Sequence, residues 1–294
     1  MEVENFKRRI DVAFSEKTAL AALSHDASHD ATSLHCIPNN LRCTGKIIAK
    51  SSFILCGVVE ANAVFRSRKI KTNWRYKEGE LVKKGSVVSS ISGNCRGVLA
   101  CERTALNYLM LLSGIATKSS AASEKYGKWK IAATRKMLPN LTDSCKRAVL
   151  LGGCLTHRMS LADGILVKDN HIAAIMKERE CRREEAVRIA VPSFPRASFV
   201  EVEVSSISEA LAAVKAGAKA ILVDNVSPAT LRSIAGAARK ANRKIIIEAS
   251  GGIALKNAGA HLRAGADFVS TSELTMKIEP ADLSLEIDRS KRSL

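Results

Sequence analysis

The chain has 294 residues, enough for one large domain or two ordinary ones, and 46% of them are hydrophobic, which excludes a disordered or fibrous protein. Only 4% are aromatic, so aliphatic side chains supply the apolar mass, as in an α/β protein with buried parallel strands. The 46 Lys and Arg residues exceed the 29 Asp and Glu residues, giving a net charge of +17, which favours an anionic partner such as nucleic acid, a lipid surface or a phosphorylated metabolite.

The N-terminal segment and the cysteines do not suggest export or a membrane. Residues 1–10 carry charges where a signal peptide needs an apolar core. No apolar run approaches the roughly 20 residues of a spanning helix. The eight cysteines include no Cys-x-x-Cys pair, so their spacing does not indicate a zinc ribbon or a thioredoxin-type motif. We expect a cytoplasmic protein in a reducing compartment.

The first hundred residues predict short strands joined by tight turns. Apolar runs at residues 46–59 and 85–91 alternate with turn signals at residues 77–80 and 92–94. Apolar and small residues then recur at helical spacing over residues 102–117. We therefore expect an N-terminal sheet with a few helices, followed by a helix that leads into a second domain.

From about residue 128 onward, apolar runs typical of strands alternate with helical segments. The clearest helices are residues 206–216 and 228–241, with Ser206 or Ser208 and Ser227 as expected start residues. This alternation predicts a parallel sheet, and its regular repetition favours a barrel or an open version of one. The expected strands are residues 129–133, 164–167, 199–204, 220–223, 245–247 and 268–269.

Small polar residues follow the last two expected strands. Active sites of α/β barrels form at the C-terminal ends of the strands, and the loops after the final strands often bind phosphate. Small residues allow backbone N–H groups to approach an oxyanion. The alternative is a pair of ordinary turns with no ligand. The two segments are Ser250-Gly251-Gly252 and Ser270-Thr271-Ser272.

Basic residues form a second candidate group. Arginine suits carboxylates and phosphates because its planar fork makes two parallel hydrogen bonds. The alternative for each basic residue is a side chain that points into solvent. If the group converges at one mouth, its ligand is small, planar and multiply anionic. The members are Arg103, Arg135, Lys136, His157, Arg158 and Lys168.

Two carboxylates, Glu203 and Asp224, end adjacent expected strands and would lie near these cations. Carboxylates in an anion site make sense if they hold ribose hydroxyls, bind Mg²⁺ through water or stabilise developing positive charge. The alternative is that they form structural ion pairs.

In this order, the segments resemble those of the quinolinate phosphoribosyltransferases, also called nicotinate-nucleotide pyrophosphorylases. Thr134-Arg135-Lys136 is similar to the family's Thr-Arg-Lys strand end, and Gly152-Gly153 with His157-Arg158 is similar to its next block. The resemblance covers most of the chain from about residue 52. The other matching blocks are residues 102–117, 168–172, 201–204, 224–225, 248–253 and 270–275.

The resemblance implies an α/β protein with two main domains. Residues 1–110 would form an N-terminal α/β sandwich domain, and residues 111–275 would form an open seven-stranded parallel α/β barrel. Residues 276–294 would pack back on the N-terminal domain. The resemblance also implies a homodimer, or a higher oligomer of dimers, in which the N-terminal domain of one subunit closes the barrel of the other. It implies no nucleic-acid or membrane partner.

The resemblance also implies roles for individual residues. Arg103 would reach the pyridine ring across the dimer interface, and Arg135, His157, Arg158 and Lys168 would hold the carboxylates of quinolinate. Lys136, Glu203 and Asp224 would be catalytic, with Mg²⁺ bound by the two carboxylates through water. Phosphoribosyl pyrophosphate would be held by Lys136, Ser250, Gly251, Gly252, Ser270, Thr271 and Ser272.

The implied reaction joins quinolinate to phosphoribosyl pyrophosphate and yields nicotinate mononucleotide, pyrophosphate and CO₂ in NAD biosynthesis. The first alternative is a phosphoribosyltransferase of the same fold that acts on nicotinate or another aromatic acid, although the basic group is rich for one carboxylate. A nucleic-acid-binding protein is less favoured because aromatic stacking residues are few.

Four positions depart from the family pattern. Ala133 stands where the family has Asp, Met137 and Asn140 lie in a changed segment after Thr-Arg-Lys, and Ser272 stands where Gly is common. These changes leave the proposed charged ligands intact. They keep a different aromatic acid, or a barrel without catalytic activity, open as alternatives.

Overall fold

The computed structural model describes residues 10–194 and 199–288, which divide into two compact units. An antiparallel-sheet unit contains residues 10–121, 137–153 and 274–288. A parallel-sheet unit contains residues 122–136 and 154–273. The units are interleaved along the chain, and α4 (Cys95–Tyr126) contributes residues to both. The domain limits expected from the sequence therefore stay predictions, and residues 289–294 of the expected C-terminal segment lie outside the described residues.

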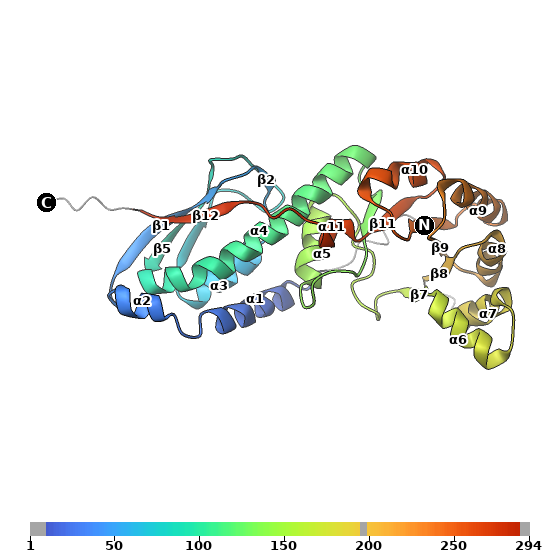
Figure 1. Ribbon diagram of the computed structural model, residues 1–294, viewed down its shortest axis with the longest axis horizontal. Coiled ribbons are helices and arrows are strands. Elements are labelled where there is room, and N and C mark those ends of the chain that lie inside the picture. The colour runs from blue at the N-terminus through green and yellow to red at the C-terminus, as the bar shows by residue number, and fades with distance from the viewer. Residues whose placement is uncertain (1–9, 195–198, 289–294) are drawn as a thin grey trace. The chain divides into compact units, whose positions relative to one another are not determined.

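The antiparallel-sheet unit has a sheet with the strand order β12-β1-β5-β3 (Figure 1). Strand β1 (Arg42–Ala49) is central and pairs antiparallel with both β5 (Val87–Asn94) and β12 (Leu283–Ile287). The segment nearest the C-terminus thus closes one edge of the first sheet. The remaining elements are α1 (Val12–Asp26), α2 (Ala31–Cys36), β2 (Phe53–Ile54), α3 (Val58–Ser67), β3 (Lys71–Trp74), β4 (Leu81–Val82), α5 (Thr142–Leu151) and α11 (Glu273–Met276).

A buried ion-pair network fixes α5 in this unit. Arg147 on α5 pairs with Glu60 on α3, whose side chain is fully buried, and Arg147 Nη1 lies 3.1 Å from a Glu78 oxygen. The other Glu78 oxygen accepts the N–H groups of Gly57 and Val58, both at 2.8 Å. Each buried charge therefore has several partners, as burial in a low-dielectric interior requires. The network explains why residues 137–153 leave the parallel sheet and join the other unit.

The parallel-sheet unit has six hydrogen-bonded strands in the order β6-β11-β10-β9-β8-β7, and each neighbouring pair is parallel. Its helices form a layer beside the strands of this sheet (Figure 1). The strands are β6 (Ile131–Ala133), β7 (Ile165–Val167), β8 (Val200–Val204), β9 (Ala220–Asp224), β10 (Ile246–Ser250) and β11 (Phe268–Thr271). The helices are α6 (Asp169–Arg179), α7 (Arg183–Ala190), α8 (Ile207–Ala216), α9 (Pro228–Ala241) and α10 (Ala258–Arg263).

The expected helix boundaries in this unit are confirmed by their caps. The Ser206 hydroxyl accepts the N–H of Glu209 at the start of α8, and the Ser227 hydroxyl accepts the N–H of Thr230 at the start of α9. Gly217 ends α8 with φ +101°, the left-handed conformation that glycine adopts without strain. These caps let each helix stop and the chain return to the next parallel strand.

The expected fold class is confirmed, with one difference in the strand count. The resemblance implied seven strands, whereas the described residues form a six-stranded sheet, and Leu155 adds an isolated parallel bridge to Ala132 on β6. Helix α5 ends at Leu151, and Gly152 and Gly153 form a turn just before Leu155. Few extended residues therefore lie beside β6 at this point. Within the described residues, no pairing joins Leu155 to β7, so the sheet is open.

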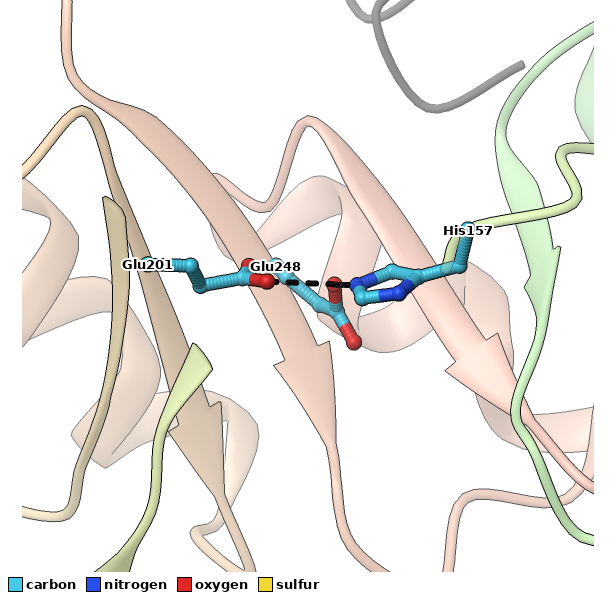
Figure 2. A group of neighbouring side chains, drawn as sticks. All are labelled: His157, Glu201 and Glu248. Atoms are coloured by element: carbon cyan, nitrogen blue, oxygen red, sulfur yellow. Dashed lines mark ion pairs between the residues drawn. The ribbon is translucent and has the colours of Figure 1, made fainter. Parts of the chain in front are cut away.

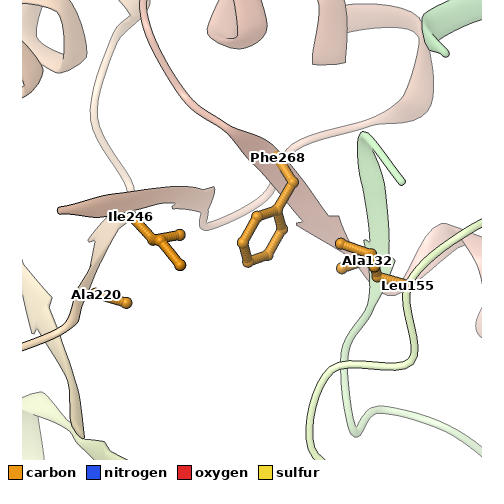
Figure 3. Close-up of a cluster of buried hydrophobic side chains, with 5 residues drawn as sticks. All are labelled: Ala132, Leu155, Ala220, Ile246 and Phe268. Carbon is orange, nitrogen blue, oxygen red and sulfur yellow. The ribbon is translucent and has the colours of Figure 1, made fainter. Parts of the chain in front are cut away.

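Alternate residues of the parallel strands share one face of the sheet. At the start of the strands this face carries an apolar cluster of Ala132, Leu155, Ala220, Ile246 and Phe268 (Figure 3). Each of these five residues is buried, with at most 4% of its surface exposed. We call this cluster the apolar floor, because polar side chains follow three of its members by two residues, toward the carboxyl ends of the strands: His157 follows Leu155, Glu248 follows Ile246 and Ser270 follows Phe268. Among the described residues, no helix has the length and hydropathy of a membrane span.

Candidate active site

Directly after the apolar floor, three buried ionisable side chains meet. His157, two residues after Leu155, points toward Glu201 on β8 and Glu248 on β10 (Figure 2). Its Nε2 atom lies 3.2 Å from a Glu201 oxygen and 2.9 Å from a Glu248 oxygen. The imidazole also lies against the floor, with its ring centroid 6.3 Å from that of Phe268. We call His157, Glu201 and Glu248 the charged layer.

Two members of the charged layer, His157 and Glu201, have raised pKa values. Burial lowers the pKa of His157, but Glu248 and Glu201 outweigh it and raise that pKa to about 9. Burial and the neighbouring Glu248 raise the pKa of Glu201 to about 7. His157 Nδ1 accepts the backbone N–H of Arg158 at 2.7 Å, which directs the protonated Nε2 at the carboxylates and opposes the second protonation that the two carboxylates promote.

We expect stability to fall as pH rises from about 6.5 to about 9, because the His157 pKa is raised over this window. The folded state binds this proton more tightly than the unfolded state, so its contribution is complete below 6.5 and lost above 9. Glu201→Gln removes one of the carboxylates, so the fall should be smaller. Urea unfolding at several pH values measures this, and an identical pH slope in both proteins would count against the assignment.

The charged layer also meets the spacing required of metal ligands, since its donor atoms lie within 4.8 Å of one another. The charges argue for a different reading. Protonated His157 and the adjacent buried Arg158 supply two positive charges against the two carboxylates. The layer is therefore balanced by side chains of the chain itself, and Mg²⁺ remains assigned by expectation to Glu203 and Asp224.

Arg158, like His157, is a buried member of the predicted basic group, with 8% of its surface exposed. Burial lowers the pKa of its guanidinium, Glu201 acts in the opposite direction, and Arg135 lowers it further. Arg135 is thus close enough to Arg158 to repel it. Two cations that lie near each other in this way gain from a shared anionic ligand, because an anion offsets both the burial and the repulsion.

Lys136 and Lys168 are exposed at the ends of their strands. The N–H of Lys136 donates to the Thr134 hydroxyl at 3.2 Å. Lys168 precedes α6, and its N–H donates to His171 Nδ1 at 2.9 Å. The charge of Lys168 lowers the pKa of Glu203, so this lysine faces the acidic pair described next.

Glu203 and Asp224 lie close together at the carboxyl ends of β8 and β9, which pair in parallel. Burial raises the pKa of Glu203, and the charge of Asp224 raises it further. Asp224 also accepts the Asn225 side-chain amide at 2.6 Å. Two half-buried carboxylates that repel each other form an oxygen-donor set that a divalent cation such as Mg²⁺ relieves.

The two predicted phosphate segments are joined by hydrogen bonds. The Ser270 hydroxyl donates to the Ser250 hydroxyl at 2.9 Å, and the Thr271 hydroxyl donates to the Ile253 carbonyl at 2.8 Å. Gly251 has φ +85°, and a Cβ there would lie 2.3 Å from the backbone nitrogen of Asn225. Only glycine allows the loop after β10 to pass this close to the loop after β9.

The structure brings most of the predicted site residues to one end of the parallel sheet. Arg103 differs, because it is exposed on the part of α4 that belongs to the antiparallel-sheet unit. The sequence prediction missed Glu201 and Glu248 as site residues. Their signal was present, because a glutamate inside a strand of otherwise buried aliphatic residues needs a specific partner.

Comparisons with known proteins identify both parts of the chain. Residues 30–113 match the model of the N-terminal domain of quinolinate phosphoribosyl transferase, and residues 115–286 match that of its C-terminal domain. A Methanocaldococcus jannaschii protein named "Probable nicotinate-nucleotide pyrophosphorylase (carboxylating)" is 36% identical over 94% of this chain and 98% of its own length. The nicotinate-nucleotide pyrophosphorylase (carboxylating) of Mycobacterium leprae is 32% identical over 92% and 96%.

Solved structures of similarly named proteins have the same fold as this chain. The structure of NadC from Streptococcus pyogenes superposes with a TM-score of 0.84 at 32% identity, covering 96% of this chain and 99% of its own. The nicotinate-nucleotide pyrophosphorylase of Francisella tularensis gives a TM-score of 0.82 at 30% identity, covering 95% and 98%. Human nicotinic acid phosphoribosyltransferase, at 12% identity and a TM-score of 0.58, shares the fold alone.

Proposed function

Because the chain belongs to the quinolinate phosphoribosyl transferase family, we propose that it transfers the phosphoribosyl group of phosphoribosyl pyrophosphate to quinolinate with decarboxylation. The products are nicotinate mononucleotide, pyrophosphate and CO₂, and the reaction serves NAD biosynthesis. The observation that carries the proposal is the match of both family domains, in order, over residues 30–113 and 115–286.

Quinolinate binds at the basic side of the site. Arg158 and Arg135 repel each other in the free protein, and the two ring carboxylates relieve that repulsion. His157, held as a cation by Glu248 and Glu201, adds a third positive group. Lys168 completes the predicted ring-side set within this unit. The planar fork of arginine matches a carboxylate with two hydrogen bonds.

Phosphoribosyl pyrophosphate binds across the strand ends on the other side. The Ser250-Gly251-Gly252 and Ser270-Thr271-Ser272 loops take the 5′-phosphate, with backbone N–H groups made accessible by the left-handed conformations of Gly251 and Gly252. Lys136 is exposed after β6 and neutralises the departing pyrophosphate. Ser272 stands where glycine is common in the family, and serine can replace glycine there only if φ is negative. The backbone meets this condition, because φ of Ser272 is not positive.

Glu203 and Asp224 fit Mg²⁺, because burial and the charge of Asp224 both raise the pKa of Glu203, and a cation bound by the pair would offset both effects. They would hold the ion through oxygen atoms, directly or through water. When bound, Mg²⁺ supplies positive charge that stabilises the pyrophosphate leaving group.

The chain's own residues position the two substrates. The bond between the anomeric carbon and pyrophosphate breaks, and the ring nitrogen of quinolinate bonds to that carbon. Glu203 and Asp224 stabilise the positive charge that develops on the ribose. The ring nitrogen becomes cationic. Its charge stabilises the electron pair that stays on the adjacent ring carbon when the carboxylate of that carbon leaves as CO₂, and this carbon then takes a proton.

Quinolinate is favoured over nicotinate because it presents two carboxylates to the basic set. Removing one partner of a buried charge pair costs about 2–5 kcal/mol, or roughly 30-fold or more in binding. We therefore expect kcat/KM for quinolinate to exceed that for nicotinate by at least about 30-fold. Steady-state assays with each acid and saturating phosphoribosyl pyrophosphate test this. Equal values, or a preference for nicotinate, would reassign the substrate.

The proposed assembly is a homodimer with shared sites, in which Arg103 of one subunit acts in the barrel of the other. The position of Arg103 outside the parallel-sheet unit supports this proposal. Arg103→Ala and Lys136→Ala should each be inactive alone. Mixed dimers should recover up to about a quarter of wild-type activity, because one of their two sites is intact and about half of the dimers are mixed. No recovery despite proven subunit exchange would contradict shared sites.

A further inference from the structure

Asn225 is the first residue after β9, and it contacts two parts of the candidate site. Its side-chain Nδ2 donates to Asp224 Oδ2 at 2.6 Å, and its backbone N–H donates to the Ser250 carbonyl at 3.2 Å. Register explains both contacts, because Asp224 and Ser250 form the last pair of β9 and β10. Asn225 therefore lies between a carboxylate of the acidic pair and the start of the first phosphate loop.

The backbone of Asn225 is left-handed, with φ +53°. Most side chains avoid this conformation, but asparagine tolerates it, because its short amide can form local hydrogen bonds. Asn225 also lies tightly against the loop, since a Cβ at Gly251 would be 2.3 Å from its backbone nitrogen and 2.5 Å from its Oδ1 atom. The residue thus combines a backbone that glycine could also supply with an amide that glycine could not.

The chemistry of the contact fixes which end of the amide faces Asp224. An ionised carboxylate only accepts hydrogen bonds, so the NH₂ group must point toward it. The amide engages Asp224 Oδ2, which limits rotation of the carboxylate and leaves its other oxygen for a cation shared with Glu203 on the neighbouring β8. Because Asn225 is exposed, this hydrogen bond contributes little to the stability of the fold. Its effect falls on the direction of the carboxylate.

Resting on the phosphoribosyl transfer proposed above, we propose that Asn225 is a positioning residue with two separable parts. Its side-chain amide orients the Asp224 carboxylate for a divalent cation, and its left-handed backbone holds the first phosphate loop. Groups that hydrogen-bond a ligating side chain typically contribute about 10-fold or more to metal affinity. Removal of the amide with the backbone retained should therefore weaken cation binding and spare phosphate binding.

Asn225→Gly makes this separation, because glycine adopts a positive φ without strain. Electron paramagnetic resonance of Mn²⁺ in a titration without substrates measures cation binding, and calorimetry with ribose 5-phosphate measures the phosphate loop. We expect the Kd for Mn²⁺ to rise about 10-fold and the Kd for ribose 5-phosphate to change by less than about 2-fold. The midpoint of urea unfolding should change little. In the assay, the Mg²⁺ concentration for half-maximal rate should rise, while the KM for quinolinate stays the same.

Two further variants separate orientation from folding. Asn225→Ala loses the same amide but must hold alanine at a positive φ, so its Kd for Mn²⁺ should match that of Asn225→Gly while its urea midpoint is lower. Asn242→Gly is the matched control. The Asn242 side chain also bonds locally, accepting the Lys244 N–H at 2.9 Å, but it precedes β10, at the amino end of the strand. This variant should bind Mn²⁺ and ribose 5-phosphate like the wild type.

The outcomes separate this inference from the proposed function. An unchanged Kd for Mn²⁺ in Asn225→Gly, or a wild type that turns over quinolinate without binding Mn²⁺, overturns the inference and leaves the proposed function standing. Equal losses of Mn²⁺ and ribose 5-phosphate affinity also overturn it, because the residue would then only shape the loop. A wild type that neither binds Mn²⁺ nor turns over quinolinate overturns both.

Discussion

Arg158→Ala should lower kcat/KM for quinolinate by about 30- to 4,000-fold, the equivalent of losing about 2–5 kcal/mol from a buried charge pair. Arg158 is nearly buried. Burial and the nearby Arg135 lower the pKa of its guanidinium, whereas Glu201, Glu248 and Asp163 raise it. The interaction of this buried cation with a substrate carboxylate is therefore strong. The loss should fall mainly on the KM for quinolinate, measured at saturating phosphoribosyl pyrophosphate.

Two further variants separate charge from geometry. Arg158→Lys keeps the charge but loses the planar fork, so its loss should be intermediate. Arg232→Ala removes an exposed arginine from α9, outside the predicted site, and should change kcat/KM by less than about 2-fold, as expected for a surface substitution. If Arg158→Ala behaved like Arg232→Ala, the assignment of the ring-side pocket would be wrong.

Gly251→Ala should disable the first phosphate loop. An added Cβ would lie 2.3 Å from the backbone nitrogen and 2.5 Å from the side-chain oxygen of Asn225. The first of these atoms belongs to the backbone and cannot move without shifting the strand end. We expect the KM for phosphoribosyl pyrophosphate to rise about 10-fold or more, and the free energy of unfolding to fall by about 1–3 kcal/mol.

Gly252→Ala is the comparison that isolates this clash. Gly252 also has a positive φ, +62°, but an added Cβ there would lie 4.0 Å from its nearest neighbour, the side-chain oxygen of Asn225. Alanine there costs only the left-handed conformation, about 1–2 kcal/mol. Gly251→Ala should be the more damaging change in both KM and urea unfolding. Equal effects would show that close approach to Asn225 does not shape the site.

The parallel sheet was predictable because its strands are local signals. Each strand from β6 to β11 is a short aliphatic run followed by polar residues, and Ser206, Ser227 and Gly217 mark helix ends by local hydrogen bonding. The linking helix was predicted too short. Residues 102–117 were expected, whereas α4 spans Cys95–Tyr126. Glycine is a poor helix former, so Gly97 obscures the start of α4 in the sequence. In the fold a Cβ at residue 97 would lie 3.3 Å from Ile70, so packing against Ile70 favours glycine there.

The carboxylates of the candidate site were predictable only where they stood at the end of a strand. Glu203 and Asp224 follow that rule, and they lie close together as expected. Glu201 and Glu248 lie inside their strands, and their roles depend on His157, which reaches them from a loop far away in sequence. Alternation along Val200–Val204 does place Glu201 on the same face as Glu203. The partner that stabilises Glu201 appears only in the folded chain.

The central claim is tested most directly by the stoichiometry of the reaction. The protein is incubated with Mg²⁺, phosphoribosyl pyrophosphate and quinolinate radiolabelled in the carboxylate next to the ring nitrogen, and CO₂, pyrophosphate and nicotinate mononucleotide are counted. We predict equal amounts of all three products, and little pyrophosphate when nicotinate replaces quinolinate. Pyrophosphate release with nicotinate and no labelled CO₂ from quinolinate would contradict the account.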